Sequence, residues 1–171
     1  MNKFLQLKKA NCKNCYKCIR NCPVKSIKFS DGQANIIADE CILCGRCFVN
    51  CPQDAKEVRN DVGKVKELLA AGRTVVASVA PSFIAEFRTL DFDAMKEALQ
   101  KLGFADAQET AIGAQIVSRE YERMIASGEH DVIISSCCHS VNSLIQKYHP
   151  LALPYLAPVL SPMLAHCKLI K

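Results

Sequence analysis

The sequence predicts an α+β module followed by a partial α/β domain with a mostly parallel sheet. Three observations support this fold class. A cysteine-rich segment repeats within residues 1–60, the composition changes near residue 60, and stretches with strand character then alternate with stretches of helical spacing. We therefore expect domains at residues 1–60 and 61–171, with the two repeats of the first domain at about 3–32 and 33–60.

The repeat is a pattern of four cysteines followed by a proline. Its spacing is Cys-x2-Cys-x2-Cys-x3-Cys-Pro, and the second copy follows the first at an offset of 29 residues. The copies comprise Cys12, Cys15, Cys18 and Cys22 before Pro23, and Cys41, Cys44, Cys47 and Cys51 before Pro52. After the first copy, residues 26–29 and 34–37 flank a Ser-Asp-Gly turn, which predicts a short hairpin.

Cysteines at this spacing indicate metal ligation. The chain has 11 cysteines, a content that is unusual in a reducing compartment unless the thiols bind metal. Three thiolates on one tight loop can surround a cubane, whereas structural zinc sites usually use two separated pairs of ligands. The sequence therefore predicts two 4Fe-4S clusters, with zinc as the alternative.

The doubled pattern resembles that of bacterial two-cluster ferredoxins, in which the fourth cysteine ligates the other cluster. One cluster is then expected on Cys12, Cys15, Cys18 and Cys51, and the other on Cys41, Cys44, Cys47 and Cys22. Because so small a module buries little apolar surface, the clusters should contribute much of its folding free energy. The residues expected to pack around the clusters are Ile19, Ile27, Ile36, Ile42 and Val49.

Charge and hydrophobicity limit the classes of partner. Residues 1–60 carry 11 Lys and Arg against five Asp and Glu. We interpret Lys13, Lys17, Arg20 and Arg46, which lie between the cysteines, as compensation for anionic clusters. Aromatic residues are sparse, so no nucleic-acid partner is expected. Tyr16, which lies between two cysteines, is interpreted as a packing residue. The absence of a secretory segment and of any long apolar run predicts a cytoplasmic protein with no membrane partner.

Residues 61–171 are predicted to alternate between helices and strands. Helices are expected at 61–71, 91–102, about 113–126, 141–148 and 162–171, and strands at 74–79, 104–110 and 131–135. Sites in parallel α/β folds lie at the carboxyl ends of strands. The loop Ser-Ser-Cys-Cys-His-Ser at 135–140 follows a predicted strand and is therefore a candidate site.

This loop resembles the first active-site motif of FeFe hydrogenases, Thr/Ser-Ser-Cys-Cys-Pro. Further similar segments are residues 80–82, 103–104, 109–110 with 113–114, 146–150 and 155–163. A ferredoxin module ahead of such a domain is a usual arrangement in that family, so the resemblance covers essentially the whole chain. His139 in place of the usual proline, and the absence of tryptophan, bring the chain closer to divergent, sensory members.

The resemblance implies roles for two adjacent cysteines. Cys138 matches the ligand of the cubane half of the H-cluster, and Cys137 matches the thiol that passes protons to the di-iron site. The family's other H-cluster ligands would follow Lys171, so we expect a truncated chain that does not catalyse the reaction alone. An H-cluster is expected only if the missing motifs are supplied. His166 and Cys167 are interpreted as ordinary helix residues.

The sequence thus predicts an iron-sulfur electron-transfer protein that feeds an FeFe-hydrogenase-like domain. A full-length relative would oxidise hydrogen, reduce protons or sense hydrogen. The alternative is a stand-alone ferredoxin-like electron carrier whose α/β appendage docks a partner. Both hypotheses require a redox protein as donor or acceptor, and the first also requires the remainder of a hydrogenase-like protein.

Overall fold

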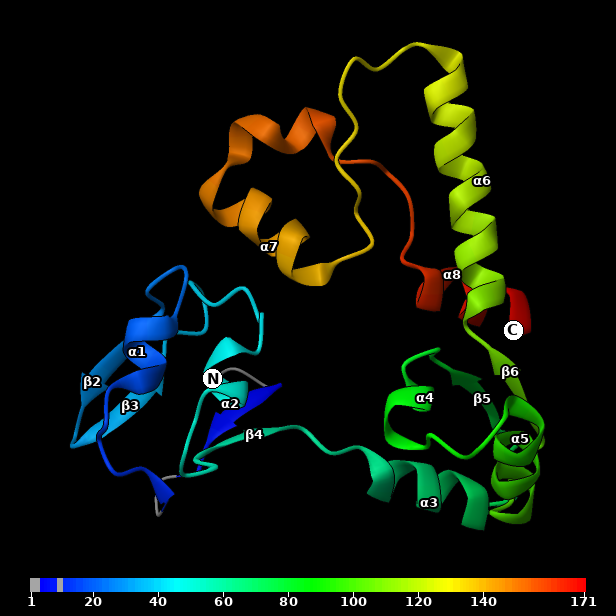
Figure 1. The fold of residues 1–171 in the computed structure, drawn as a ribbon, viewed down its shortest axis with the longest axis horizontal. Coiled ribbons are helices and arrows are strands. Elements are labelled where there is room, and N and C mark those ends of the chain that lie inside the picture. The colour runs from blue at the N-terminus through cyan, green and yellow to red at the C-terminus, as the bar shows by residue number, and fades with distance from the viewer. Residues whose placement is uncertain (1–3, 9–10) are drawn as a thin grey trace. The chain divides into compact units, whose positions relative to one another are not determined.

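The computed structural model describes residues 4–8 and 11–171, so the predicted start of the first repeat at residue 3 lies outside the described residues. The chain forms two compact units (Figure 1). The first unit contains the chain up to Asn60 together with residues 139–153, and the second contains residues 61–138 and 154–171. Helices and small sheets are mixed in both units.

The first unit is built around two antiparallel strand pairs. β1 (Leu5–Leu7) lies beside β4 (Lys56–Val58), and β2 (Ile27–Ser30) lies beside β3 (Gln33–Ile36). The pairing of β2 with β3 confirms the predicted hairpin, whose turn at Asp31 and Gly32 has positive φ at both residues, as tight hairpins favour. The β1–β4 pair was not predicted, because strands this short give no clear alternation of apolar and polar residues.

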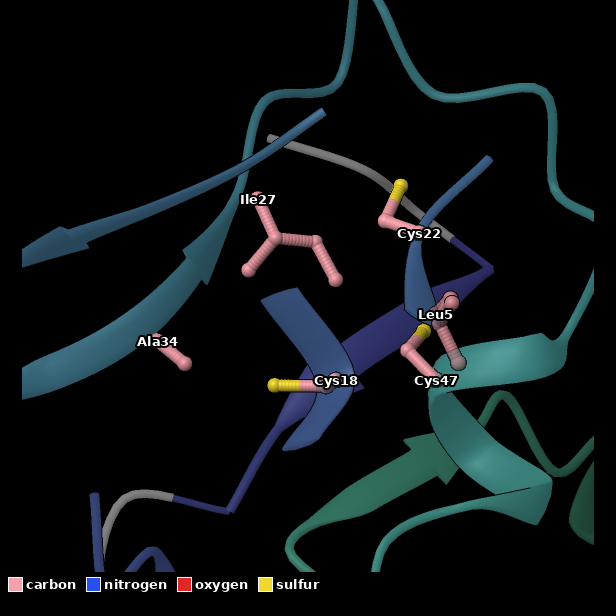
Figure 2. Close-up of a cluster of buried hydrophobic side chains, with 6 residues drawn as sticks. All are labelled: Leu5, Cys18, Cys22, Ile27, Ala34 and Cys47. Carbon is pink, nitrogen blue, oxygen red and sulfur yellow. The ribbon is translucent and has the colours of Figure 1, made fainter. Parts of the chain in front are cut away.

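Short helices complete the first unit. They are α1 (Lys17–Asn21), α2 (Arg46–Val49) and α7 (His139–Tyr148), and η2 (Pro150–Tyr155) follows α7. The core is small and rich in sulfur: its buried residues are Leu5, Cys18, Cys22, Ile27, Ala34 and Cys47 (Figure 2). In Figure 2, Cys18 and Cys47 enter this core from α1 and α2, respectively. Cysteines that line the candidate site are therefore also part of the buried core of this unit.

The prediction of residues around the clusters was partly correct. Ile27 and Ile42 are buried, and Ile19 and Ile36 are partly buried. The prediction was wrong for Val49, which is 80% exposed. Val49 lies two residues after the buried Cys47 in α2, about 200° further around the helix, so it faces away from the core.

The second unit contains a parallel pair of strands connected through helices. β5 (Val76–Val79) pairs with β6 (Asp106–Glu109), with Val76 opposite Asp106. The helices are α3 (Val62–Ala70), α4 (Phe83–Glu86), α5 (Phe92–Lys101), α6 (Ala111–Ser127) and α8 (Pro162–Ile170) (Figure 1). All except α4 were predicted within a few residues. The strand predicted at 104–110 is confirmed as β6.

The strand predicted at 131–135 is wrong. This segment makes a single parallel bridge, between Ile134 and Leu156, in which the Ile134 N–H donates to the Tyr155 carbonyl over 2.7 Å. The segment directly before Leu156 is the 3-10 helix η2, which ends at Tyr155, so the ladder does not continue in that direction.

Packing of α8 against the start of α6 organises the second unit. Gly113 is buried, and a Cβ there would overlap the Pro162 carbonyl oxygen and lie 2.8 Å from the His166 Cβ. His166 is fully buried; its Nδ1 lies 2.8 Å from the Ser78 hydroxyl and its Nε2 lies 3.2 Å from the Gln108 side-chain oxygen. His166 is a residue of α8, as expected, and its buried side chain also ties α8 to both β5 and β6.

Within residues 4–8 and 11–171, no helix combines the length and hydrophobicity needed to cross a bilayer.

Candidate functional site

Two cysteine loops with matching backbone conformations form the site in the first unit. Positive φ angles occur in pairs separated by the 29-residue repeat: Asn14 and Leu43, Tyr16 and Gly45, and Lys25 and Asp54. Gly45 adopts φ = 73° without a Cβ penalty, whereas Tyr16 adopts φ = 58° with a side chain. Backbone amides in such turns can converge on an anion. The repeat therefore exists in the backbone as well as in the residue pattern.

The first cavity is lined by Cys12, Cys15, Cys18 and Cys51 and encloses about 350 Å³ of space, including its open mouth. Its cysteines come from the first loop and from the end of the second. Tyr16 forms part of the wall, with its ring centroid 5.0 Å from that of Phe29, which confirms a packing role for this tyrosine.

The second cavity is lined by Cys22, Cys41, Cys44 and Cys47 and encloses about 300 Å³. Its apolar walls include Leu5, Val24, Ile27, Ile36 and Ile42. The Cys22 Sγ lies 3.5 Å from the hydroxyl of Ser26, which is itself buried. This cavity is therefore the counterpart of the first, with the contributions of the two loops exchanged.

The composition of the cavities fits the cofactor predicted from the sequence. Each cavity is lined by three cysteines from one loop and the fourth cysteine from the other. Four thiols in a largely apolar surround suit a cubane iron-sulfur cluster, whose stability and potential depend on thiolate ligands and on exclusion of water. Within the part of the chain that the structure describes, no three His, Cys, Asp or Glu side chains converge on one point as the ligands of a single metal ion.

At two of the repeat positions the cysteines have the same exposure in both cavities. Cys18 and Cys47, which occupy equivalent positions in the repeat, are buried, and the equivalent pair Cys15 and Cys44 is exposed. Each cavity thus has one cysteine at the surface, where a redox partner can approach. The remaining cysteines are Cys22, which is buried, and Cys12, Cys41 and Cys51, which are partly buried.

Burial, backbone hydrogen bonds and one lysine shift the pKa of three cavity thiols. Burial raises the pKa of Cys18 and raises that of Cys47 to about 11, while the charge of Lys56 opposes both shifts. Burial also acts to raise the pKa of Cys12, but backbone hydrogen bonds and Lys56 outweigh it, so this pKa is lowered. Because metal ligands must be deprotonated, a thiol with a raised pKa releases a proton when it binds metal.

Backbone amides donate to two of the cysteine sulfurs. The Leu43 N–H donates to the Cys41 Sγ over 3.4 Å, and the Ala55 N–H donates to the Cys51 Sγ over 3.2 Å. Hydrogen bonds to ligand sulfurs are among the factors that set the reduction potential of an iron-sulfur cluster. The two loops therefore combine thiols with backbone donors that can stabilise negative charge on sulfur.

The end of α7 contacts the second cysteine loop. The Lys147 Nζ donates to the Cys41 carbonyl oxygen over 2.8 Å, and the Tyr148 hydroxyl donates to the Glu40 carbonyl oxygen over 2.7 Å. Burial and then the negative charge of Glu40 raise the pKa of Tyr148, so its hydroxyl remains a donor. Sequence reasoning assigned no role to Lys147 or Tyr148, because a contact across more than 100 residues leaves no local pattern.

The second candidate site is the loop of Cys137 and Cys138. Cys137 is half-buried, and its Sγ lies 3.9 Å from the hydroxyl of Tyr121 on α6. The same hydroxyl accepts the Ser136 N–H over 3.0 Å, so Tyr121 holds the loop in place. Cys138 is exposed immediately before α7. The sequence contains no sign of this role for Tyr121, because a tyrosine in a long amphipathic helix fits the same pattern as any other residue that faces the core. Cys167 is exposed on α8 and joins neither site.

The fold and the two cysteine-lined cavities define the class of iron-sulfur electron-transfer proteins. Residues 4–52 match the 4Fe-4S dicluster domain, and residues 73–171 match the C-terminal domain of the iron-only hydrogenase large subunit. The second match covers more than half of the chain. The chain belongs to the iron-only hydrogenase large-subunit family, and its cofactors are 4Fe-4S clusters.

A shorter similarity links the chain to a curated relative. The chain is 40% identical over 48 residues to one subunit of the ion-translocating oxidoreductase complex of Methanosarcina acetivorans. The match covers 28% of this chain and 18% of the relative, so the chain spans less than a fifth of that protein's length.

Proposed function

We propose that the chain binds one 4Fe-4S cluster in each cavity. The first-cavity cluster is held by Cys12, Cys15, Cys18 and Cys51, and the second-cavity cluster by Cys22, Cys41, Cys44 and Cys47. The observation that carries this proposal is that each cavity is lined by four cysteines drawn from both loops. When bound, the clusters supply one-electron redox chemistry. The chain holds the thiolates, donates amides to sulfur and surrounds the site with apolar side chains.

Variants that separate crossed from uncrossed ligation test this proposal. Anaerobic reconstitution of the unchanged chain should give about eight irons and eight sulfides, with interacting EPR signals from the two reduced clusters. Cys12→Ser combined with Cys51→Ser should retain one intact cluster, because both ligands belong to the same cavity. Cys12→Ser combined with Cys22→Ser should damage both clusters.

The matched control is Cys167→Ser, which removes an exposed cysteine outside both cavities and should leave the iron content unchanged. Equal iron loss in the two double variants would contradict crossed ligation. Stoichiometric zinc without the EPR signals would contradict iron-sulfur binding altogether.

The function supported best is delivery of electrons to an FeFe-hydrogenase-like domain, for hydrogen oxidation, proton reduction or hydrogen sensing. In this proposal residues 1–60 are the ferredoxin-like domain, with repeats at about 3–32 and 33–60, and residues 61–171 are part of the hydrogenase-like domain. The parallel pairing of β5 with β6 and the parallel bridge at Ile134 support a larger, mostly parallel sheet in that domain. Segment 139–153, which packs in the first unit, would connect the two domains.

In the same proposal Cys138 is an H-cluster ligand and Cys137 exchanges protons with the catalytic site. The exposure of Cys138 and the contact of Cys137 with a tyrosine hydroxyl support these roles. One thiolate cannot hold a cubane, so further ligands have to come from other residues.

Co-expression with hydrogenase maturation proteins and with the ligand-bearing part of a related hydrogenase tests the role of Cys138. We expect iron above the eight atoms of the two cubanes, lost in Cys138→Ser and kept in Cys167→Ser. Extra iron that persists in Cys138→Ser would overturn the assignment.

A further inference from the structure

A buried lysine lies beside the proposed cluster sites. Lys56 is the first residue of β4 and is 3% exposed, although lysine is rarely buried in folded proteins. Its position opposite Leu7 in the β1–β4 ladder keeps it inside the first unit. The Nζ donates a hydrogen bond to the Ala34 carbonyl oxygen over 2.7 Å, which fixes the ammonium group at the end of the side chain.

No carboxylate compensates the charge of Lys56 among residues 4–8 and 11–171: the Ala34 carbonyl is its hydrogen-bond partner, and it belongs to no salt bridge there. A buried charge of this kind is costly unless an opposite charge lies nearby. The groups available for this purpose are the cysteines. Lys56 lines the first cavity together with Cys12, Cys18 and Cys51.

The position of Lys56 differs between the two cavities. It forms part of the wall of the first cavity but not of the second. In contrast, the four basic residues expected from the sequence to compensate the clusters, Lys13, Lys17, Arg20 and Arg46, are exposed to solvent.

We propose that Lys56 is a fixed positive charge that raises the reduction potential of the first-cavity cluster and, to a smaller extent, that of the second-cavity cluster. The inference rests on the cluster ligation proposed above. Reduction adds one electron to a cluster and makes it more negative, so a nearby cation stabilises the reduced form more than the oxidised form. Burial strengthens this interaction because the surrounding dielectric constant is low and salt screens little.

Lys56→Met tests the proposal by removing the charge while keeping an unbranched side chain. Both clusters are titrated with dithionite at controlled potential, and their reduction is followed by EPR. The first-cavity cluster should become at least tenfold harder to reduce, a fall of about 59 mV for a one-electron couple. The second-cavity cluster should shift by less. Cys12→Ser and Cys41→Ser, each of which damages one cluster, assign the signals to the cavities.

Three further variants separate charge from structure. Lys56→Gln keeps a donor for the Ala34 carbonyl but has no charge, so it should behave like Lys56→Met. If the Lys56→Met protein does not assemble, Lys56→Gln replaces it in the test. Lys56→Arg keeps the charge and should stay near the original potential. Lys17→Met removes an exposed charge from the first cysteine loop and should cause a much smaller shift, because solvent screens it.

Iron and sulfide are measured on every sample. A content near eight irons in the unchanged chain establishes the clusters independently of the potentials, so the failure of cluster ligation is distinguishable from the failure of the role of Lys56. Fully loaded Lys56→Met or Lys56→Gln protein with unchanged potentials would overturn the inference. A larger shift at the second-cavity cluster than at the first would also overturn it.

Discussion

At the scale of single residues, burial separates side chains that look alike in the sequence. Lys13, Lys17 and Lys56 are all lysines near cysteines, yet only the last of these three is buried. His166 and Cys167 are neighbours on α8, but the histidine is fully buried and the cysteine is exposed. The difference depends on which elements pack against each residue, and it determines which of them can influence a site.

Gly113→Ala is predicted to destabilise the second unit. The new Cβ would overlap the backbone carbonyl of Pro162, which cannot move aside without displacing α8. Overpacking of this kind costs about 1–3 kcal/mol, more than the roughly 1 kcal/mol that alanine gains over glycine in a helix. We expect a net loss of up to about 2 kcal/mol. Urea unfolding followed by circular dichroism, with hydrogen exchange of α8 to locate the effect, measures it.

The matched control for this prediction is Gly63→Ala in α3. A Cβ at Gly63 would meet no atom within 4 Å, so this substitution should stabilise its helix by about 0.5–1 kcal/mol through propensity alone. If Gly113→Ala raised stability as Gly63→Ala does, the close approach of α6 and α8 would not exist in solution.

At the scale of elements, the helices were predictable because their ends carry local signals. Asp91 is the N-cap of α5, where its carboxylate accepts the Ala94 N–H over 2.8 Å. Gly72, just past the end of α3, has φ = 66°, a conformation that glycine adopts readily. These interactions lie within one turn of the chain, so the residue pattern is sufficient to indicate them.

The strands were less predictable because their partners are distant in the sequence. Val132 to Ser135 have the residue types of a buried strand, yet Ile134 alone pairs, with Leu156, which directly follows the 3-10 helix η2. Conversely, β4 begins with a lysine and a glutamate and still forms a strand, because β1 pairs with it. The burial of Lys56 follows from that pairing.

At the scale of the whole molecule, the two units differ in what stabilises them. The core of the first unit contains three cysteines among its six buried residues. The second unit has no cysteine in a comparable core; α8 is tied to β5 and β6 by His166 and packs closely on α6. The first unit should therefore depend on its clusters for folding, whereas the second should not.

Removal of iron is predicted to unfold the first unit selectively. A chelator under oxidising conditions should abolish hydrogen-exchange protection in β1 to β4, because the few apolar side chains of this unit cannot offset its conformational entropy without metal. Protection in α5 and α6 should persist. Mass spectrometry of exchanged peptides resolves the two units. Protected amides in the iron-free β2–β3 hairpin would show that the apolar core suffices.

The sequence by itself determined the two-cluster repeat, the hairpin between its copies, most helices of the second unit and the two sets of cavity cysteines. It could do so because the information lies in spacing, caps and turns that act within a few residues. Only the tertiary structure decided that Lys56 is buried beside the cavities, that Tyr121 holds the Cys137 loop, that α7 contacts the Cys41 loop and that His166 links α8 to two strands. Each of these depends on packing between segments distant in the chain, for which a single sequence carries no periodic pattern.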